Sequence, residues 1–101
     1  MKVFKMNDCD WVAAETEEQA KSFYANQTGF DLQEEINPDF EGEVSLNDTM
    51  FIGVNELPEE ELLMPQETTK YGNELYVSRS FHWVIEKDKI TEPCIISSTE
   101  F

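Results

Sequence analysis

The side chains of this sequence best suited to chemistry are carboxylates. Residues 31–67 contain twelve Asp and Glu residues, and no Lys or Arg occurs between Lys21 and Lys70. Closely spaced carboxylates can pair with Lys and Arg of a partner where phosphates would otherwise sit. The same residues can equally form a solvated face that keeps a small protein soluble. If they form a binding surface, we expect it to consist of Glu34, Glu35, Asp39, Glu41, Glu43, Glu59, Glu60 and Glu61.

Part of this segment follows the spacing of a calcium-binding EF-hand loop. The oxygen-bearing and glycine residues of the pattern are Asn37, Asp39, Glu41, Gly42 and Asp48. An EF-hand normally begins with Asp and ends with the longer Glu, and here Pro38 occupies the second loop position. A weak calcium-binding module is therefore an alternative ranked behind a solvated acidic turn, and we expect no metal site and no cofactor.

Residues for nucleophilic catalysis are few. The one histidine, His82, lies between two aromatic residues, and Cys9 and Cys94 belong to no metal-binding or redox motif. The four glycines are scattered, so no glycine-rich phosphate-binding loop is present. We therefore expect that the protein is not an enzyme, and that both cysteines are reduced and buried as small apolar side chains.

Composition limits the classes of partner. The 101 residues include 22 acidic residues against 7 Lys and Arg, for a formal net charge of −15. This charge repels nucleic acid and anionic membranes and favours basic protein surfaces. The apolar runs are far shorter than the roughly 18 residues that span a membrane, and Asp8 interrupts any signal-peptide core. We expect one cytoplasmic domain over residues 1–101, with an acidic module over 31–67.

The N-terminal segment predicts a hairpin followed by a helix. Apolar and polar residues alternate before the turn-forming residues 7–10, and apolar residues follow them, which predicts a β-hairpin over residues 2–14. Thr16 opens a capping box, so a helix should start at Glu17. That helix should end before Gly29, which suits the left-handed conformation found after helices.

Shorter elements are expected in the middle of the chain. Asp31 repeats the capping pattern for a short helix, which Asn37-Pro38 should stop because a residue before proline avoids helical angles. The elements expected next are a loop over 39–49, a buried strand over 50–54, a helical turn over 58–64 and a turn region over 66–74.

The C-terminal part predicts strand, helix and strand. Residues 75–77 can open a strand, Ser80 or Ser78 can cap a helix over residues 80–89, and residues 93–100 suit a final strand. The aromatic and β-branched residues at 81–85 would also suit a strand, so pattern alone leaves that segment open.

These elements predict an α+β fold. We expect a small mixed or antiparallel sheet of three to five strands that includes the hairpin and the last strand. Two main helices, near residues 17–28 and 80–89, should pack on one face of that sheet. The expected core residues are Val3, Phe4, Trp11, Val12, Ala20, Phe23, Val84, Ile85 and Ile95.

The sequence KMNDCDWVAA at residues 5–14, together with Thr28-Gly29 and the closing SSTEF at residues 97–101, resembles short uncharacterised phage and prophage proteins. The resemblance covers the two ends of the chain and not the acidic middle. It implies a helix over residues 80–89 before the last strand. It also implies a phage or mobile-element origin, a setting in which small acidic proteins such as anti-CRISPR proteins inhibit host defence systems.

Charge and resemblance together give one leading hypothesis. The protein would be a phage-encoded, non-catalytic, anti-CRISPR-like inhibitor that acts in the host cytoplasm. Its carboxylates would mimic DNA and bind the basic, nucleic-acid-binding surface of a host defence nuclease or effector complex. The alternative is an accessory phage protein without an inhibitory role.

Overall fold

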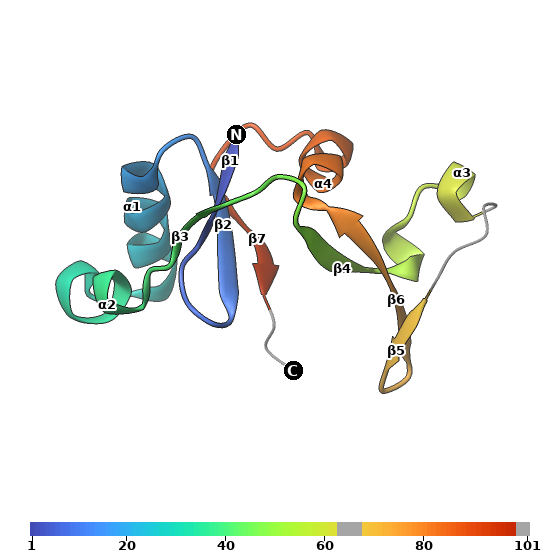
Figure 1. The fold of residues 1–101 in the computed structure, drawn as a ribbon, viewed down its shortest axis with the longest axis horizontal. Coiled ribbons are helices and arrows are strands. Elements are labelled where there is room, and N and C mark those ends of the chain that lie inside the picture. The colour runs from blue at the N-terminus through green and yellow to red at the C-terminus, as the bar shows by residue number, and fades with distance from the viewer. Residues whose placement is uncertain (63–67, 99–101) are drawn as a thin grey trace.

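A computed structural model describes residues 1–62 and 68–98, whose strands form two antiparallel sheets (Figure 1). The first sheet has the strand order β3-β1-β2-β7 and the second has the order β4-β6-β5. The strands are β1 (Lys2–Lys5), β2 (Asp10–Ala14), β3 (Gly42–Val44), β4 (Thr49–Gly53), β5 (Thr69–Tyr71), β6 (Glu74–Ser80) and β7 (Cys94–Ser98). The helices are α1 (Glu17–Thr28), the π-helix η1 (Leu32–Ile36), α2 (Asn37–Asp39), the 3₁₀-helix η2 (Val54–Glu56), α3 (Glu59–Leu62) and α4 (Phe81–Asp88).

The α+β class is confirmed, and the sheet that contains the hairpin and the last strand has four antiparallel strands. Two features differ from the expectation. A second, three-stranded sheet is present, and the two main helices do not share a face. Buried residues of α1 pack with Phe4 and Val12, whereas buried residues of α4 pack with Val3 and Ala13 on the opposite face.

The hairpin and the first helix form as predicted. Strands β1 and β2 pair from Lys2↔Ala14 to Lys5↔Trp11. Helix α1 begins where the Thr16 hydroxyl accepts a hydrogen bond from the Gln19 N–H, at 3.1 Å. It ends at Gly29, whose φ of 75° lies in the left-handed region that glycine adopts without steric cost.

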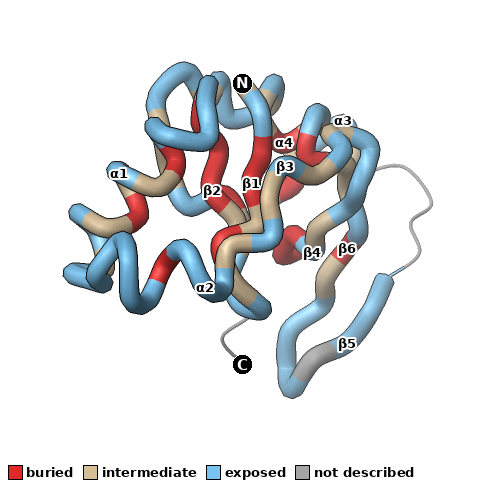
Figure 2. The backbone as a smooth tube through the Cα atoms, turned by 60° about the vertical axis from the view of Figure 1, so that its left-hand side comes forward, coloured by how far each residue is buried: buried red, intermediate tan, exposed pale blue. Residues whose placement is uncertain are grey.

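Two clusters of buried residues lie on opposite faces of the four-stranded sheet, because successive side chains of a strand point to opposite faces. Figure 2 shows buried residues along the backbone of β1, β2, α1 and α4. The α1-side core, between the sheet and α1, consists of Phe4, Met6, Val12, Ala14, Ala20, Tyr24 and Ile36. The β4-side core, between the sheet and the second sheet with α4, consists of Val3, Ala13, Ile52, Leu57, Val77, Phe81, Val84 and Ile96.

Five of the predicted core residues are buried: Val3, Phe4, Val12, Ala20 and Val84. Trp11, Phe23 and Ile85 are partly buried against the two clusters.

The prediction was wrong for Ile95, which is 40% exposed. A β-bulge explains the error, since Trp11 pairs with Ser97 while Val12 pairs with Ile95. Ile96 is therefore the extra residue of the bulge in β7. Its side chain, and not that of Ile95, is buried in the β4-side core.

Asn37-Pro38 does not stop the short helix as predicted. The Asp31 carboxylate does cap η1, accepting hydrogen bonds of 2.9 Å from the N–H groups of Gln33 and Glu34. The helical path then continues into α2 (Asn37–Asp39). Pro38 is tolerated because it lies in the first turn of α2, where a backbone N–H has no partner within the helix.

The short strands of the middle region were missed. Residues 39–49 include β3, which pairs with β1, and residues 66–74 include β5, which pairs with β6. The predicted helical turn at 58–64 appears as α3, and its last two residues lie outside the described part of the chain.

The later elements agree with the predictions more closely. Strand β6 runs from Glu74 to Ser80, and the Ser80 hydroxyl caps α4 by accepting from the Trp83 N–H at 3.1 Å. Strand β7 begins at Cys94, one residue after the start of the predicted final strand, and residues 99 and 100 of that prediction lie outside the described part of the chain.

Candidate functional site

The predicted acidic binding residues lie in three separate places. Glu34, Glu35 and Asp39 belong to η1 and α2, Glu41 and Glu43 lie before and within β3, and Glu59–Glu61 belong to α3. Helices α2 and α3 occupy opposite ends of the elongated molecule, which measures 46 × 28 × 20 Å (Figure 1). The eight residues therefore do not form one continuous patch.

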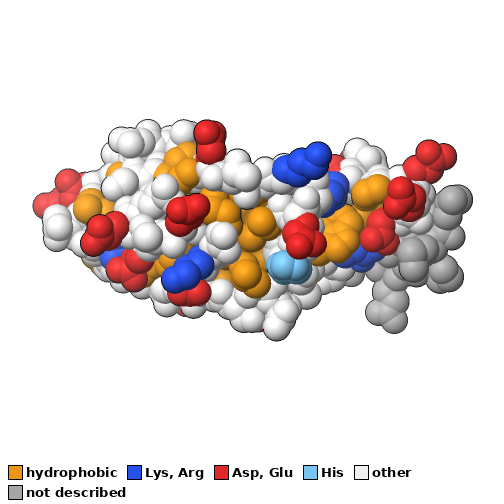
Figure 3. Space-filling model, turned by 90° about the horizontal axis from the view of Figure 1, so that it is seen from above, with side chains coloured by type: hydrophobic (Ala, Val, Ile, Leu, Met, Phe, Trp, Pro, Cys, Tyr) orange, Lys and Arg blue, Asp and Glu red, His pale blue; other side chains and the backbone are white. Residues whose placement is uncertain are grey.

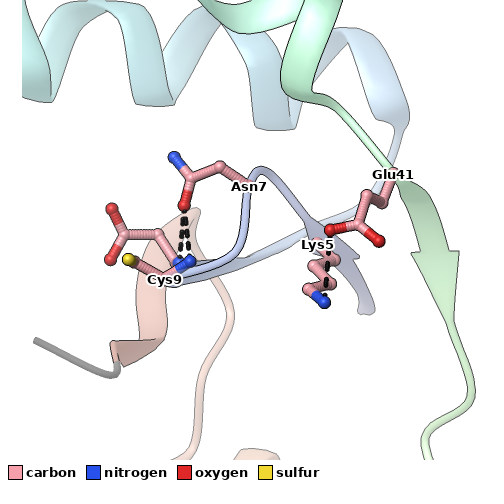
Figure 4. Close-up of polar contacts among 5 residues, drawn as sticks. Lys5, Asn7, Cys9 and Glu41 are labelled. Carbon is pink, nitrogen blue, oxygen red and sulfur yellow. Dashed lines mark hydrogen bonds and ion pairs between the residues drawn. The ribbon is translucent and has the colours of Figure 1, made fainter.

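The flanks of the chain supply counterions to the acidic segment. Strand β3 pairs with β1, and this places Glu41 3.2 Å from Lys5 (Figure 4) and Glu43 3.8 Å from Lys2. Glu61 lies 3.4 Å from Arg79. The segment lacks cations in sequence but receives three in space, so Glu41, Glu43 and Glu61 are weaker candidates for binding a partner than the sequence suggested.

The remaining predicted residues, Glu34, Glu35, Asp39, Glu59 and Glu60, are exposed. Five of the seven basic residues already form ion pairs with carboxylates: Lys2, Lys5, Lys21, Arg79 and Lys87. The surplus of negative charge is consequently left on the surface. On the face seen in Figure 3 the carboxylates are scattered, with apolar side chains exposed between them.

The calcium-binding loop is not formed. Residues 37–39 are helical, and residues 42–44 form a strand that pairs with β1, so the twelve positions do not wrap around a common centre. Within residues 1–62 and 68–98, no three His, Cys, Asp or Glu side chains are grouped so that they could hold a metal ion.

Both cysteines are free thiols, but only Cys94 is even partly buried, whereas burial was predicted for both. Cys9 is exposed, so its predicted burial was wrong. It lies at the hairpin turn, where the Asn7 side chain accepts hydrogen bonds from the Cys9 and Asp10 N–H groups at 2.8 and 2.9 Å (Figure 4). Cys94 is partly buried in β7. Burial, with a smaller effect of the Asp88 charge, raises the pKa of the Cys94 thiol and makes it a poor nucleophile.

His82 lies on the exposed side of α4, where its Nε2 is 3.2 Å from a carboxylate oxygen of Glu86 one turn along the helix. This geometry is that of a surface pair, which contributes at most about 1 kcal/mol to stability. Among the residues that the structure describes, His82 is thus paired with a carboxylate and not with a hydroxyl or a thiol.

A buried tyrosine holds the hairpin turn onto α1. The Tyr24 hydroxyl donates a hydrogen bond to the Asp10 carboxylate and accepts one from the Asn7 amide at 2.8 Å. Tyr24 is 1% exposed. Burial, and then the hydrogen bond to Asp10, raises the pKa of Tyr24 to about 12. The side chain therefore stays neutral near neutral pH and has a structural role.

A groove that the sequence did not predict lies where the two sheets meet. It consists of two adjoining cavities of about 650 and 320 Å³, both lined by Met50 and Phe51 of β4. The larger cavity is also lined by Trp11 of β2 and by Ser97 and Ser98 of β7, and the smaller by Cys94, Ile95 and Ile96 of β7. We call it the inter-sheet groove. Such volumes are typical of ligand-binding clefts.

Neither a protein-family model, nor a curated protein, nor a solved structure gives a significant match to this chain. No helix among the described residues is both long enough and apolar enough to cross a membrane.

Proposed function

We propose that the protein is a non-catalytic inhibitor that binds the basic, nucleic-acid-binding surface of a host defence protein. The observation that carries the proposal is that most of the basic residues form ion pairs within the chain. Five of seven are engaged by carboxylates of the same chain, so few cations are free to repel a basic partner, and the formal net charge of the whole chain is −15. A surface of this kind attracts basic partners and raises the rate of association with them.

The density of charge fits the imitation of a nucleic acid. Over the 46 Å length of the molecule, one strand of B-DNA would carry about 14 phosphates at one per 3.4 Å. The formal net charge of −15 is close to that value. The exposed pairs Glu34-Glu35 and Glu59-Glu60 lie at opposite ends of the molecule, so a partner with a long basic channel could contact both.

The resemblance of the chain ends to phage and prophage proteins supports the class of partner. A phage protein that acts on a host defence nuclease or effector complex works in the host cytoplasm. There its competitor is the nucleic acid that normally fills the basic channel.

The proposal is tested by capture followed by displacement. The immobilised protein is incubated with lysate of a bacterial host at about 0.1 M salt, where the Debye length is about 10 Å, and then washed with short duplex DNA. We expect a nucleic-acid-binding protein to be retained and then released by the duplex. Retention that neither duplex DNA nor 1 M salt reverses would refute imitation of nucleic acid.

Matched variants locate the contact. Glu34→Gln/Glu35→Gln and Glu59→Gln/Glu60→Gln each remove two charges from one end, while Glu15→Gln/Glu18→Gln removes two exposed charges near the start of α1. At least one end pair should weaken capture several-fold, about 1 kcal/mol, and the control pair should have less effect. Equal losses in all three variants would mean that only net charge matters.

A further inference from the structure

Two strand edges border the inter-sheet groove. Strand β7 is the last strand of the order β3-β1-β2-β7, and β4 is the first strand of the order β4-β6-β5. Both cavities are lined by residues of β7 and of β4, so the groove runs between these two edges. An edge strand presents backbone N–H and C=O groups that can pair with another chain.

The four sheet edges differ in composition. The edges remote from the groove each carry a charged residue, Glu43 in β3 and Lys70 in β5. The edges that border the groove, TMFIG in β4 and CIISS in β7, contain neither a charged residue nor proline. Proteins normally protect edge strands with such residues, because unprotected edges pair with other strands. Among the described strands, the edges without such residues are the two that border the groove.

We propose that the inter-sheet groove binds an extended segment of a partner protein, which adds to the outer edge of β7. Side chains of an added strand alternate between the two faces of the sheet. Those on one face would enter the cavities beside Met50 and Ile96. Those on the other would cover the exposed side of Ile95, which lies at the rim of the smaller cavity, pairs with Val12 of the α1-side core and is 40% exposed.

Charge identifies the chemistry of that segment as basic as well as apolar. The two lysines on the groove wall are already paired, Lys5 with Glu41 at 3.2 Å and Lys87 with Asp88 at 3.1 Å. Asp48 lines the larger cavity and Glu56 the smaller, and within the described residues neither carboxylate is in an ion pair. A second copy of this chain is disfavoured, since each copy carries −15.

The probe for this site is a nine-residue peptide in which valine alternates with lysine. Its control is the same peptide with N-methylated valines, which keeps charge and composition but cannot donate those backbone hydrogen bonds. In ¹⁵N-labelled protein we expect the first peptide to shift amide resonances of β7 and β4 and to slow hydrogen exchange in β7. Equal binding of both peptides, or shifts confined to η1 and α3, would overturn the proposal.

A charged residue placed on the edge provides the matched variant test. Ile95→Lys adds to β7 the type of residue that protects β5, and Leu75→Lys makes the same change on β6, at a site 47% exposed and outside the groove. Both variants should fold, as thermal unfolding will verify. We expect Ile95→Lys to weaken peptide binding about tenfold and Leu75→Lys less than about twofold. Equal losses would overturn the proposal.

Sedimentation of the unliganded protein distinguishes a partner segment from the other possible occupant of the groove, a second copy of this chain. A monomer at micromolar concentration is expected, whereas a dimer that Ile95→Lys dissociates would assign the groove to a second copy and refute a partner segment. The inference is independent of the proposed function, because none of the end residues Glu34, Glu35, Glu59 and Glu60 lines the groove.

Discussion

The two faces of the four-stranded sheet are covered in different ways. On one face α1 packs along the hairpin, and the Tyr24 hydroxyl is hydrogen-bonded to both Asp10 and Asn7. On the other face the second sheet and the eight-residue α4 cover the β4-side core but leave the inter-sheet groove open beside it. The α1 face is therefore closed by packing and hydrogen bonds, while the opposite face retains an open groove, to which we have assigned the proposed binding of a partner segment.

The largest expected effect is loss of stability in the α1-side core. Phe4 is 3% exposed and stacks on Phe40 with ring centroids 6.4 Å apart. Phe4→Ala should lower the free energy of unfolding by about 3–5 kcal/mol, since it leaves a cavity in packed surroundings. Thermal and urea unfolding measure the change. Ile95→Thr, at the groove edge, should cost less than about 1 kcal/mol, and comparable losses in the two variants would contradict the division between the faces.

A smaller effect is expected at Tyr24 and depends on pH. Tyr24→Phe leaves Asp10 and Asn7 without the hydroxyl and should cost about 1–3 kcal/mol near neutral pH. The pKa of Tyr24 is raised above its unfolded value of about 10 to about 12 in the folded protein. Its stabilising contribution is therefore complete below pH 10 and is lost as pH rises to about 12.

Urea unfolding between pH 8 and 12 tests whether the stabilising contribution of Tyr24 is lost at high pH. The difference in stability between wild type and Tyr24→Phe should shrink through that window. A constant difference up to pH 12 would show that Tyr24 does not hold a raised pKa.

The smallest expected effect is a difference in reactivity between the two cysteines. Cys9 lies at the hairpin turn and Cys94 lines the inter-sheet groove. Cys9 is exposed, whereas Cys94 is partly buried with a raised pKa. Because the thiolate is the reactive form, iodoacetamide at pH 8 should modify Cys94 at least about tenfold more slowly than Cys9. Mass spectrometry of the native protein at timed intervals measures both rates, and unfolding in urea should abolish the difference. Equal rates in the native protein would place Cys94 on the surface.

Local sequence signals found the helices because a helix cap involves residues only two or three positions apart. Thr16, Asp31 and Ser80 each accept the predicted type of hydrogen bond at a helix start. The hairpin was likewise predictable from alternation and a turn between adjacent strands.

Features that depend on contacts between residues far apart in the sequence could not be predicted from short stretches of it. Strands β3 and β5 have three residues each, too few to show alternation, and they exist through pairing with β1 and β6. The bulge that exposes Ile95 is set by the register against β2. The ion pairs of Glu41 and Glu43, and the inter-sheet groove, follow from those pairings. The predicted acidic site was dispersed for the same reason.

The pairing of β2 with β7 sets an order on the folding of a newly synthesised chain. Asp10 and Ser98, joined by a side-chain hydrogen bond of 2.7 Å, are 88 residues apart in sequence. At about 5–20 residues per second, the roughly 80 residues between Ala14 and Cys94 take a ribosome about 4–16 seconds to add. The hairpin and α1 can assemble in that interval. The edge of β2 that pairs with β7 is still unpaired then, and the β4-side core still lacks Ile96. The strong negative charge of the chain disfavours association between such incompletely folded molecules.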